Sequence, residues 1–241
     1  MYKNIIFDLY GTLIDIKTDE ESSSFWHLIT DFYKKNNANY KQDELKSTYL
    51  CLCNKYKKKI SKIKKTDYVD IELYFVFKKL YLLKNINPTP KLVKETMNYF
   101  RIKSTKYIKL YDHVKELLTL LTNKKYNLYV LSDAQRYFTI PEIKKLGIDK
   151  YFKDIYISSI YRISKPNKDY FEILIDKHNL NKEETLYIGN DYNKDIIGAR
   201  NANIKSIYVK SNLSPKDDYI YEKEIAKCVS SSNLLDIINF L

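Results

Sequence analysis

Hydrophobic residues follow two different spacings over the second half of the chain. The stretch YDHVKELLTLL predicts a helix with one buried face, made by Val114, Leu117, Leu118 and Leu121. Short apolar runs predict strands at residues 126–132, 154–159, 185–190 and 206–209. Helical segments are expected at residues 141–146, 169–178 and 196–202, and over LLDIINF at residues 234–240. Strict alternation of strands and helices predicts an α/β fold, with a Rossmann-like parallel sheet and helices on both faces.

The first half of the chain does not show this alternation of strands and helices. It opens with the apolar run IIFDLYGTLID, which predicts a strand that delivers Asp8 to a loop. Residues 20–107 contain no glycine and break at 36–39, 61–67 and 85–90, which predicts four helices. One of them, IELYFVFKKLYLL at residues 71–83, is apolar on nearly every side and is expected to be buried in a small bundle. We therefore expect a core of residues 1–15 and 106–241, with a helical insertion at 16–105.

Charge and composition narrow the classes of partner. The formal net charge is +12, but only four of the 42 basic residues are Arg, and the Lys residues are scattered along the whole chain. Nucleic-acid binding normally needs basic residues gathered on one surface, so it is disfavoured. Three cysteines without metal-ligand spacing, no signal segment and no apolar stretch of about 18 residues predict a cytoplasmic protein without a membrane partner. Oligomeric state stays open.

Chemically useful side chains follow the predicted strands. Asp8 follows the first strand, Ser132 ends the next, and Ser158 or Ser159 ends the third. After the last of them come Lys165 in the sequence ISKP and, at the end of another strand, the acidic segment GNDYNKD. Because catalytic side chains of parallel sheets lie at the carboxyl ends of the strands, this set suits phosphoryl or acyl-type displacement.

In these motifs the chain resembles the haloacid dehalogenase superfamily. Members of that superfamily carry Asp-x-Asp-x-Thr after strand one, Ser or Thr after strand two, a Lys near the next helix and an acidic motif after strand four. The matching positions in this sequence are Asp8, Thr12, Ser132, Lys165, Asp191 and Asp195. The resemblance implies that residues 16–105 form a helical cap, which opens about hinges near residues 15–18 and 104–109.

The resemblance also implies a mechanism with a covalent intermediate. Asp8 would attack the substrate, Lys165 would hold the nucleophile and the transferring group by charge, and Ser132 and Thr12 would donate hydrogen bonds to that group.

A magnesium ion is implied for the phosphatases of the superfamily. Its ligands would be Asp8, the backbone carbonyl of Tyr10 and a carboxylate of the fourth motif. Asn190 stands where many relatives have the ligating Asp, so the choice among Asn190, Asp191 and Asp195 stays open.

Tyr10 departs from the phosphatase pattern, in which a second Asp acts as acid and base. Tyrosine, with an ordinary pKa near ~10, is a poor general base at neutral pH. The form Asp-x-Tyr-Gly-Thr is similar to that of the 2-haloacid dehalogenases, whose leaving halide needs no proton. Those enzymes use an arginine of the cap for the halide, yet residues 11–100 contain no Arg. In addition, the two carboxylates of GNDYNKD would repel a substrate carboxylate unless a cation lay between them.

The sequence therefore favours a hydrolase that uses Mg²⁺ and an aspartate nucleophile on phosphomonoesters of small anionic metabolites. A metal-independent 2-haloacid dehalogenase is the first alternative. A degenerate member that binds a phosphorylated ligand without turnover is the second.

Overall fold

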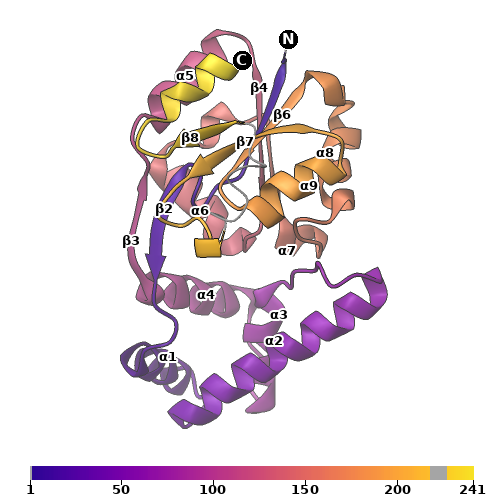
Figure 1. Ribbon diagram of the computed structural model, residues 1–241. Coiled ribbons are helices and arrows are strands. Elements are labelled where there is room, and N and C mark those ends of the chain that lie inside the picture. The colour runs from indigo at the N-terminus through magenta and orange to yellow at the C-terminus, as the bar shows by residue number, and fades with distance from the viewer. Residues whose placement is uncertain (1, 218–226) are drawn as a thin grey trace.

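The first strand lies in the middle of the sheet, as a buried apolar run predicts. The computed structural model describes residues 2–217 and 227–241, and within them one sheet has six strands in the order β5-β4-β1-β6-β7-β8 (Figure 1). The strands are β1 (Asn4–Phe7), β4 (Asn127–Ser132), β5 (Asp154–Ile157), β6 (Thr185–Gly189), β7 (Lys205–Lys210) and β8 (Cys228–Ser230). Every neighbouring pair is parallel, which confirms the predicted sheet.

Side chains of the central strands alternate between two apolar layers. Ile5 and Phe7 belong to the layer that contains α5 (Val114–Asn123), where the four predicted apolar positions are all buried. Ile6 belongs to the other layer, with α8 (Lys168–His178) and α9 (Ile197–Asn201). Successive strand residues point to opposite faces, so a strand that is buried throughout needs helices on both sides. The structure has them.

The four helices expected in the insertion are present and share an apolar core of their own. They are α1 (Ser23–Lys35), α2 (Gln42–Lys64), α3 (Leu73–Leu83) and α4 (Pro90–Ser104). Side-chain hydroxyls cap the N-termini of α1 and α4. Ser22 accepts a hydrogen bond from the backbone N–H of Phe25, and Thr89 accepts one from that of Leu92. The prediction of burial for the whole of residues 71–83 is wrong. Phe75 and Leu83 are 43% and 48% exposed, because only one face of α3 packs into the bundle.

A two-stranded antiparallel ribbon, β2 (Ile14–Thr18) with β3 (Thr105–Leu110), joins the helices to the sheet (Figure 1). The sequence pattern did not predict it, because most of β3 is exposed or half-buried and carries little apolar signal. The predicted boundaries at 15/16 and 105/106 fall inside this ribbon. The two predicted hinge segments are therefore paired with each other by backbone hydrogen bonds.

The observed boundaries of several helices and strands differ from the predicted ones. Helix α6 (Arg136–Leu146) begins five residues before the predicted start and contains Pro141, while Gly147 ends it in the left-handed conformation as expected. Strand β5 stops at Ile157, and the two serines at 158 and 159 begin the short helix α7 (Ser158–Tyr161). The last predicted helix is the 3₁₀ helix η5 (Leu234–Phe240), and 3₁₀ turns also occur at Asp149–Tyr151 and Lys182–Glu184. A π-helical turn, η3 (Tyr192–Ile196), leads into α9.

No helix within the described residues is both long and apolar enough to cross a membrane.

Leu117 tests the apolar layer beneath α5. The side chain is fully buried, so Leu117→Ala should lower the free energy of unfolding by about 2–5 kcal/mol through lost burial and a residual cavity. Urea denaturation followed by circular dichroism measures this change. The matched control is Lys115→Ala on the exposed face of the same helix, which should change stability by less than about 0.5 kcal/mol. Equal effects of the two substitutions would contradict the assigned packing.

Candidate active site

Four polar side chains are buried at the carboxyl-end edge of the sheet. Asp8 follows β1, Asn190 follows β6, Asp195 lies in the π-helical turn after it, and Lys165 lies in the loop before α8. Each is at most 5% exposed. Polar groups buried to this extent must be paired with one another, since each has lost its water. The contacts within the site show how they are paired.

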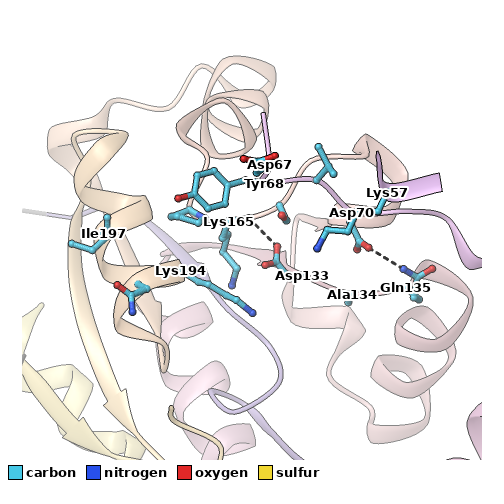
Figure 2. Close-up of a pocket in the computed structure, with 14 residues that line it drawn as sticks. Lys57, Asp67, Tyr68, Asp70, Asp133, Ala134, Gln135, Lys165, Lys194 and Ile197 are labelled. Atoms are coloured by element: carbon cyan, nitrogen blue, oxygen red, sulfur yellow. Dashed lines mark hydrogen bonds between the residues drawn. The ribbon is translucent and has the colours of Figure 1, made fainter. Parts of the chain in front are cut away.

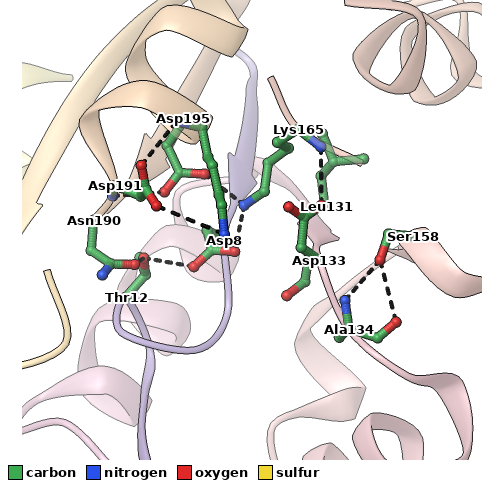
Figure 3. Close-up of polar contacts among 12 residues, drawn as sticks. Asp8, Thr12, Leu131, Asp133, Ala134, Ser158, Lys165, Asn190, Asp191 and Asp195 are labelled. Atoms are coloured by element: carbon green, nitrogen blue, oxygen red, sulfur yellow. Dashed lines mark hydrogen bonds and ion pairs between the residues drawn. The ribbon is translucent and has the colours of Figure 1, made fainter. Parts of the chain in front are cut away.

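The ammonium of Lys165 lies at the centre of this cluster (Figure 3). Its Nζ atom is 2.7 Å from Asp8 Oδ1 and 2.6 Å from Asp195 Oδ1. The hydroxyl of Tyr187 lies 3.1 Å from the same nitrogen and donates to Asp195 Oδ1 at 2.9 Å. The other oxygen of Asp195 accepts the backbone N–H of Asp191 at 3.0 Å. Both carboxylate oxygens of Asp195 are thus occupied, and its carboxylate orients Lys165.

Burial and charge act in opposite directions on this group of residues. Burial by itself lowers the pKa of Lys165, but Asp195 and Asp8 together hold that pKa well above its ordinary value. Lys165 therefore stays protonated. Burial raises the pKa of Asp8, and Lys165 opposes that effect. The cation is what keeps a buried carboxylate available at this position.

Thr12 connects the loop after β1 to the loop after β6. Its hydroxyl lies 3.1 Å from Asp8 Oδ2 and 3.2 Å from Asn190 Oδ1, so these two oxygens lie around a single hydroxyl group. Gly11 makes the approach possible: its φ is +92°, and a Cβ on it would lie 2.4 Å from the Asn190 side-chain nitrogen. Asp191 lies further out and caps the next turn, with Oδ1 accepting the backbone N–H of Lys194 at 2.9 Å.

Tyr10 extends its hydroxyl toward α6. The hydroxyl donates to Glu142 and lies 3.1 Å from the Thr139 hydroxyl. Glu142 in turn accepts two hydrogen bonds from Arg101 of α4, at 2.6 and 3.2 Å, and the Arg101 guanidinium lies 5.7 Å from the centre of the Tyr10 ring. Burial, with the charge of Glu142, raises the pKa of Tyr10. Tyr10 therefore links the nucleophile loop to a helix of the insertion.

Asp133 was not among the predicted residues, although it directly follows Ser132. Its Oδ1 accepts the backbone N–H of Lys165 at 3.0 Å. Burial raises the pKa of Asp133 to about 6, against the opposing charge of Lys165. The only sequence signal was its position after a strand that ends in the site.

A cavity of about 730 Å³ opens above Lys165 (Figure 2). Its lining comes from α2 and the loop between α2 and α3, from the loop after β4, from the loop before α8, and from the π-helical turn with the start of α9. The charged residues on its wall are Lys57, Asp67, Asp70, Asp133, Lys165 and Lys194. Asp8 is not on the wall, but it lies directly behind the Lys165 ammonium. Lys165 is therefore a residue of the cavity wall that also contacts Asp8.

Comparison with known proteins agrees with this arrangement. A model of the family described as haloacid dehalogenase-like hydrolase matches residues 5–209, which is most of the chain. The chain belongs to the haloacid dehalogenase-like hydrolases. As a member of this family it is a hydrolase.

The individual relatives are distant. A glyceraldehyde 3-phosphate phosphatase of Methanothermobacter thermautotrophicus is 31% identical over 103 residues, a match that spans 43% of this chain and 46% of that protein. The structure of a 2-haloacid dehalogenase from Pseudomonas syringae pv. Tomato DC3000 covers 100% of this chain and 99% of its own, with TM-score 0.68 and 15% identity. The magnesium-bound structure of the putative hydrolase YfnB from Bacillus subtilis covers 100% and 98%, with TM-score 0.56 and 17% identity. At these identities the two structures establish the shared fold.

The predicted metal ligands of this haloacid dehalogenase-like hydrolase are only partly gathered together. Among the described residues there is no cluster of three or more His, Cys, Asp or Glu side chains placed to hold a metal ion. Asp195 is bound to Lys165, and Asp191 caps a turn, so the acidic motif does not form a carboxylate cage. Asp8 and Asn190 do converge, through Thr12.

The predicted serines have different surroundings. Ser132 is buried, and its carbonyl accepts the Tyr170 hydroxyl at 2.9 Å, while donation from its own hydroxyl to a substrate stays a prediction. The hydroxyl of Ser158 accepts the backbone N–H of Ala134 at 2.8 Å and donates to Asp70 at 2.5 Å. Ser159 accepts the backbone N–H of Arg136 at 3.2 Å. The two serines after β5 therefore hold the loop that carries Asp133 in place through hydrogen bonds to its backbone.

The raised pKa of Asp133 predicts a pH-dependent stability difference. Because the folded protein binds this proton more tightly than the unfolded chain does, the stabilisation is complete below about pH 4 and is lost as pH rises through about 6. A neutral amide in place of this carboxyl group escapes that loss. Asp133→Asn should unfold with a free energy higher than wild type by about 3 kcal/mol at pH 8, and nearly equal to it below about pH 4.

Urea denaturation at the two pH values makes this measurement. Asp176→Asn, which removes an exposed carboxylate from α8, is the control for the loss of one charge. A wild-type protein that is the more stable of the two at pH 8 would contradict the assigned environment of Asp133.

Proposed function

We propose that this hydrolase cleaves phosphomonoesters of small anionic metabolites, with Asp8 as nucleophile and Mg²⁺ as cofactor. The observation that carries the proposal is the pairing of one Asp8 oxygen with Lys165 and of the other with Thr12, directly behind the wall of the cavity. A buried, ion-paired carboxylate next to an ammonium suits attack on a charged phosphoryl group. The phosphatase named among the relatives supports this substrate class.

The reaction would pass through a phosphorylated Asp8. Attack of its carboxylate on phosphorus forms the new bond, and the bond to the leaving oxygen breaks with its electron pair. Lys165 contacts the nucleophile and lines the cavity, so it can balance the charge of the transferring group in the transition state. Asp195 is a positioning residue, because it acts by holding Lys165. Water then cleaves the aspartyl phosphate and releases inorganic phosphate.

The oxygen donors of the site fit a magnesium ion with few protein ligands. Asp8, the Tyr10 carbonyl and Asn190 would hold it, and bound Mg²⁺ would neutralise phosphoryl oxygens. The magnesium in the related YfnB structure supports this cofactor. Only one of the three ligands is a carboxylate, since Asn190 is neutral and Asp195 is committed to Lys165. We therefore expect weak binding, in which water and substrate supply the remaining ligands.

Metal-independent dehalogenation is the second candidate, and the Tyr10 contacts favour it. A hydroxyl that already donates to Glu142 is not free to protonate a leaving group, and a halide needs no proton. Against this function, the insertion at residues 16–105 contains a single arginine, Arg101 of α4, and it is bound by Glu142 through two hydrogen bonds. An arginine so engaged is poorly placed to receive a halide.

A release assay with and without Mg²⁺ separates these functions. Wild type should release phosphate from p-nitrophenyl phosphate only with Mg²⁺, while Asp8→Asn should release none, because an amide is not a nucleophile for phosphorus. Asp176→Asn, prepared in the same way, should behave like wild type and so controls for handling. Chloride release from 2-chloropropionate without metal would establish the dehalogenase instead. Binding of phosphate with neither product would establish a binding protein.

The neutral ligand at position 190 gives a second test. Asn190→Asp adds a carboxylate beside Asp8, so the Mg²⁺ concentration that raises the thermal unfolding midpoint should fall at least about tenfold. Thermal unfolding across a Mg²⁺ titration measures this, and it needs no substrate. Asp176→Asn should leave the titration unchanged. An Asn190→Asp variant with the wild-type Mg²⁺ dependence would exclude position 190 as a ligand.

A further inference from the structure

The proposed reaction leaves one proton without a donor. An alcohol leaves phosphorus readily only if its oxygen is protonated as the bond breaks. The residue two positions after the nucleophile cannot supply this proton, because the Tyr10 hydroxyl donates to Glu142 on α6. Glu142 is itself fixed by Arg101. A different group of this site must therefore meet the leaving oxygen.

Asp133 is attached to the catalytic lysine from the opposite end. The backbone N–H of Lys165 donates to Asp133 Oδ1 at 3.0 Å, while the side chain of the same lysine reaches Asp8 Oδ1 at 2.7 Å. Figure 3 shows the two carboxyl groups on either side of Lys165. Lys165 therefore fixes the position of Asp133 relative to the nucleophile.

The cavity decides the direction in which a leaving group departs. Nucleophile and leaving oxygen lie on opposite sides of the transferring phosphorus. Asp8 is buried behind Lys165, so the leaving group must point away from it, into the cavity of about 730 Å³. Asp133 is on the wall of that cavity and Asp8 is not (Figure 2). The carboxyl group of Asp133 is thus on the leaving-group side.

We propose that Asp133 is the general acid and base of this site, a role that rests on the proposed phosphatase function. In the first step its carboxylic acid gives a proton to the leaving oxygen as the bond from phosphorus to that oxygen breaks, which yields a neutral alcohol, phosphorylated Asp8 and ionised Asp133. In the second step ionised Asp133 takes a proton from the attacking water. The new oxygen–phosphorus bond forms, Asp8 leaves as a carboxylate, hydrogen phosphate is released and Asp133 is protonated again.

The groups around Asp133 suit both halves of this cycle. Burial raises its pKa to about 6, and the charge of Asp70 in the loop between α2 and α3 acts in the same direction. Lys165 and Lys194 act in the opposite direction and limit the rise. Tyr170 on α8 donates its hydroxyl to the neighbouring carbonyl of Ser132. A carboxyl group in this range is available in both protonation states near neutral pH.

The test compares two substrates that differ in their need for an acid. Glycerol 3-phosphate releases an alcohol that must be protonated, whereas p-nitrophenyl phosphate releases a stabilised phenolate. Asp133→Asn keeps an oxygen for the Lys165 N–H but cannot exchange a proton. With Mg²⁺ present, it should lower kcat for glycerol 3-phosphate by about 10² or more and change formation of p-nitrophenolate in the first turnover far less.

Wild-type pH profiles give a second readout that does not depend on the variant. The rate with glycerol 3-phosphate should fall as pH rises above about 6, where Asp133 loses the proton that it must donate. The first-turnover rate with p-nitrophenyl phosphate should lack this decline.

Asp176→Asn is the matched control, because it removes an exposed carboxylate of α8 that does not line the cavity. It should leave the ratio of the two substrates as in wild type. Two results would overturn the role of Asp133 while leaving the phosphatase function in place. One is an equal loss of first-turnover rate with both substrates in Asp133→Asn, and the other is a wild type that cleaves p-nitrophenyl phosphate but not glycerol 3-phosphate. A wild type that releases phosphate from neither substrate would overturn the phosphatase function and this role with it.

Discussion

The site depends on a single buried ammonium between two buried carboxylates. Taking Lys165, Asp8 and Asp195 out of water costs several kcal/mol for each ion. This cost is offset only because the ion pairs are short and because further hydrogen bonds satisfy the remaining polar atoms of the three side chains. These contacts join the loop after β1, the loop before α8 and the turn after β6. The backbone allows it because Gly189 has no Cβ, which would lie 2.4 Å from the Asp195 carboxylate. Removing the ammonium would leave two unpaired anions in the interior.

The same edge of the sheet also carries the contacts that hold the helical insertion. At one end Arg101 and Glu142 bind α4 to α6 beside Tyr10. At the other end Gln135 donates to the Ile71 carbonyl at 2.7 Å and accepts the Leu73 N–H at 3.0 Å. Gln135 lies two positions after Asp133, in the same loop. Any movement of the insertion must therefore break polar contacts next to Asp133 and Tyr10, which couples access to the cavity with the geometry of the candidate site.

Much of the fold was predictable because burial on both faces leaves a strong apolar pattern. The strands at Asp8, Ser132 and Asn190 were recognisable for that reason, and the polar residue that ends each one indicated the site. The β2–β3 ribbon left no such pattern, since its side chains are mostly exposed or half-buried. The partners of Tyr10 could not be predicted either, because Glu142 is 132 positions away and nothing local marks it. At Asp195, the spacing of residues in the sequence could not show whether the carboxylate binds a metal ion or pairs with Lys165.

The proposed role of Asp8 as nucleophile is tested by looking for a phosphoryl group on its side chain. The enzyme would be quenched in acid during turnover of p-nitrophenyl phosphate with Mg²⁺, digested, and its peptides examined by mass spectrometry. A phosphorylated Asp8 predicts one phosphoryl group on the peptide that contains this residue, and none on that peptide in Asp8→Asn. Phosphate release with Asp8 unmodified, or with the group on another residue, would contradict it.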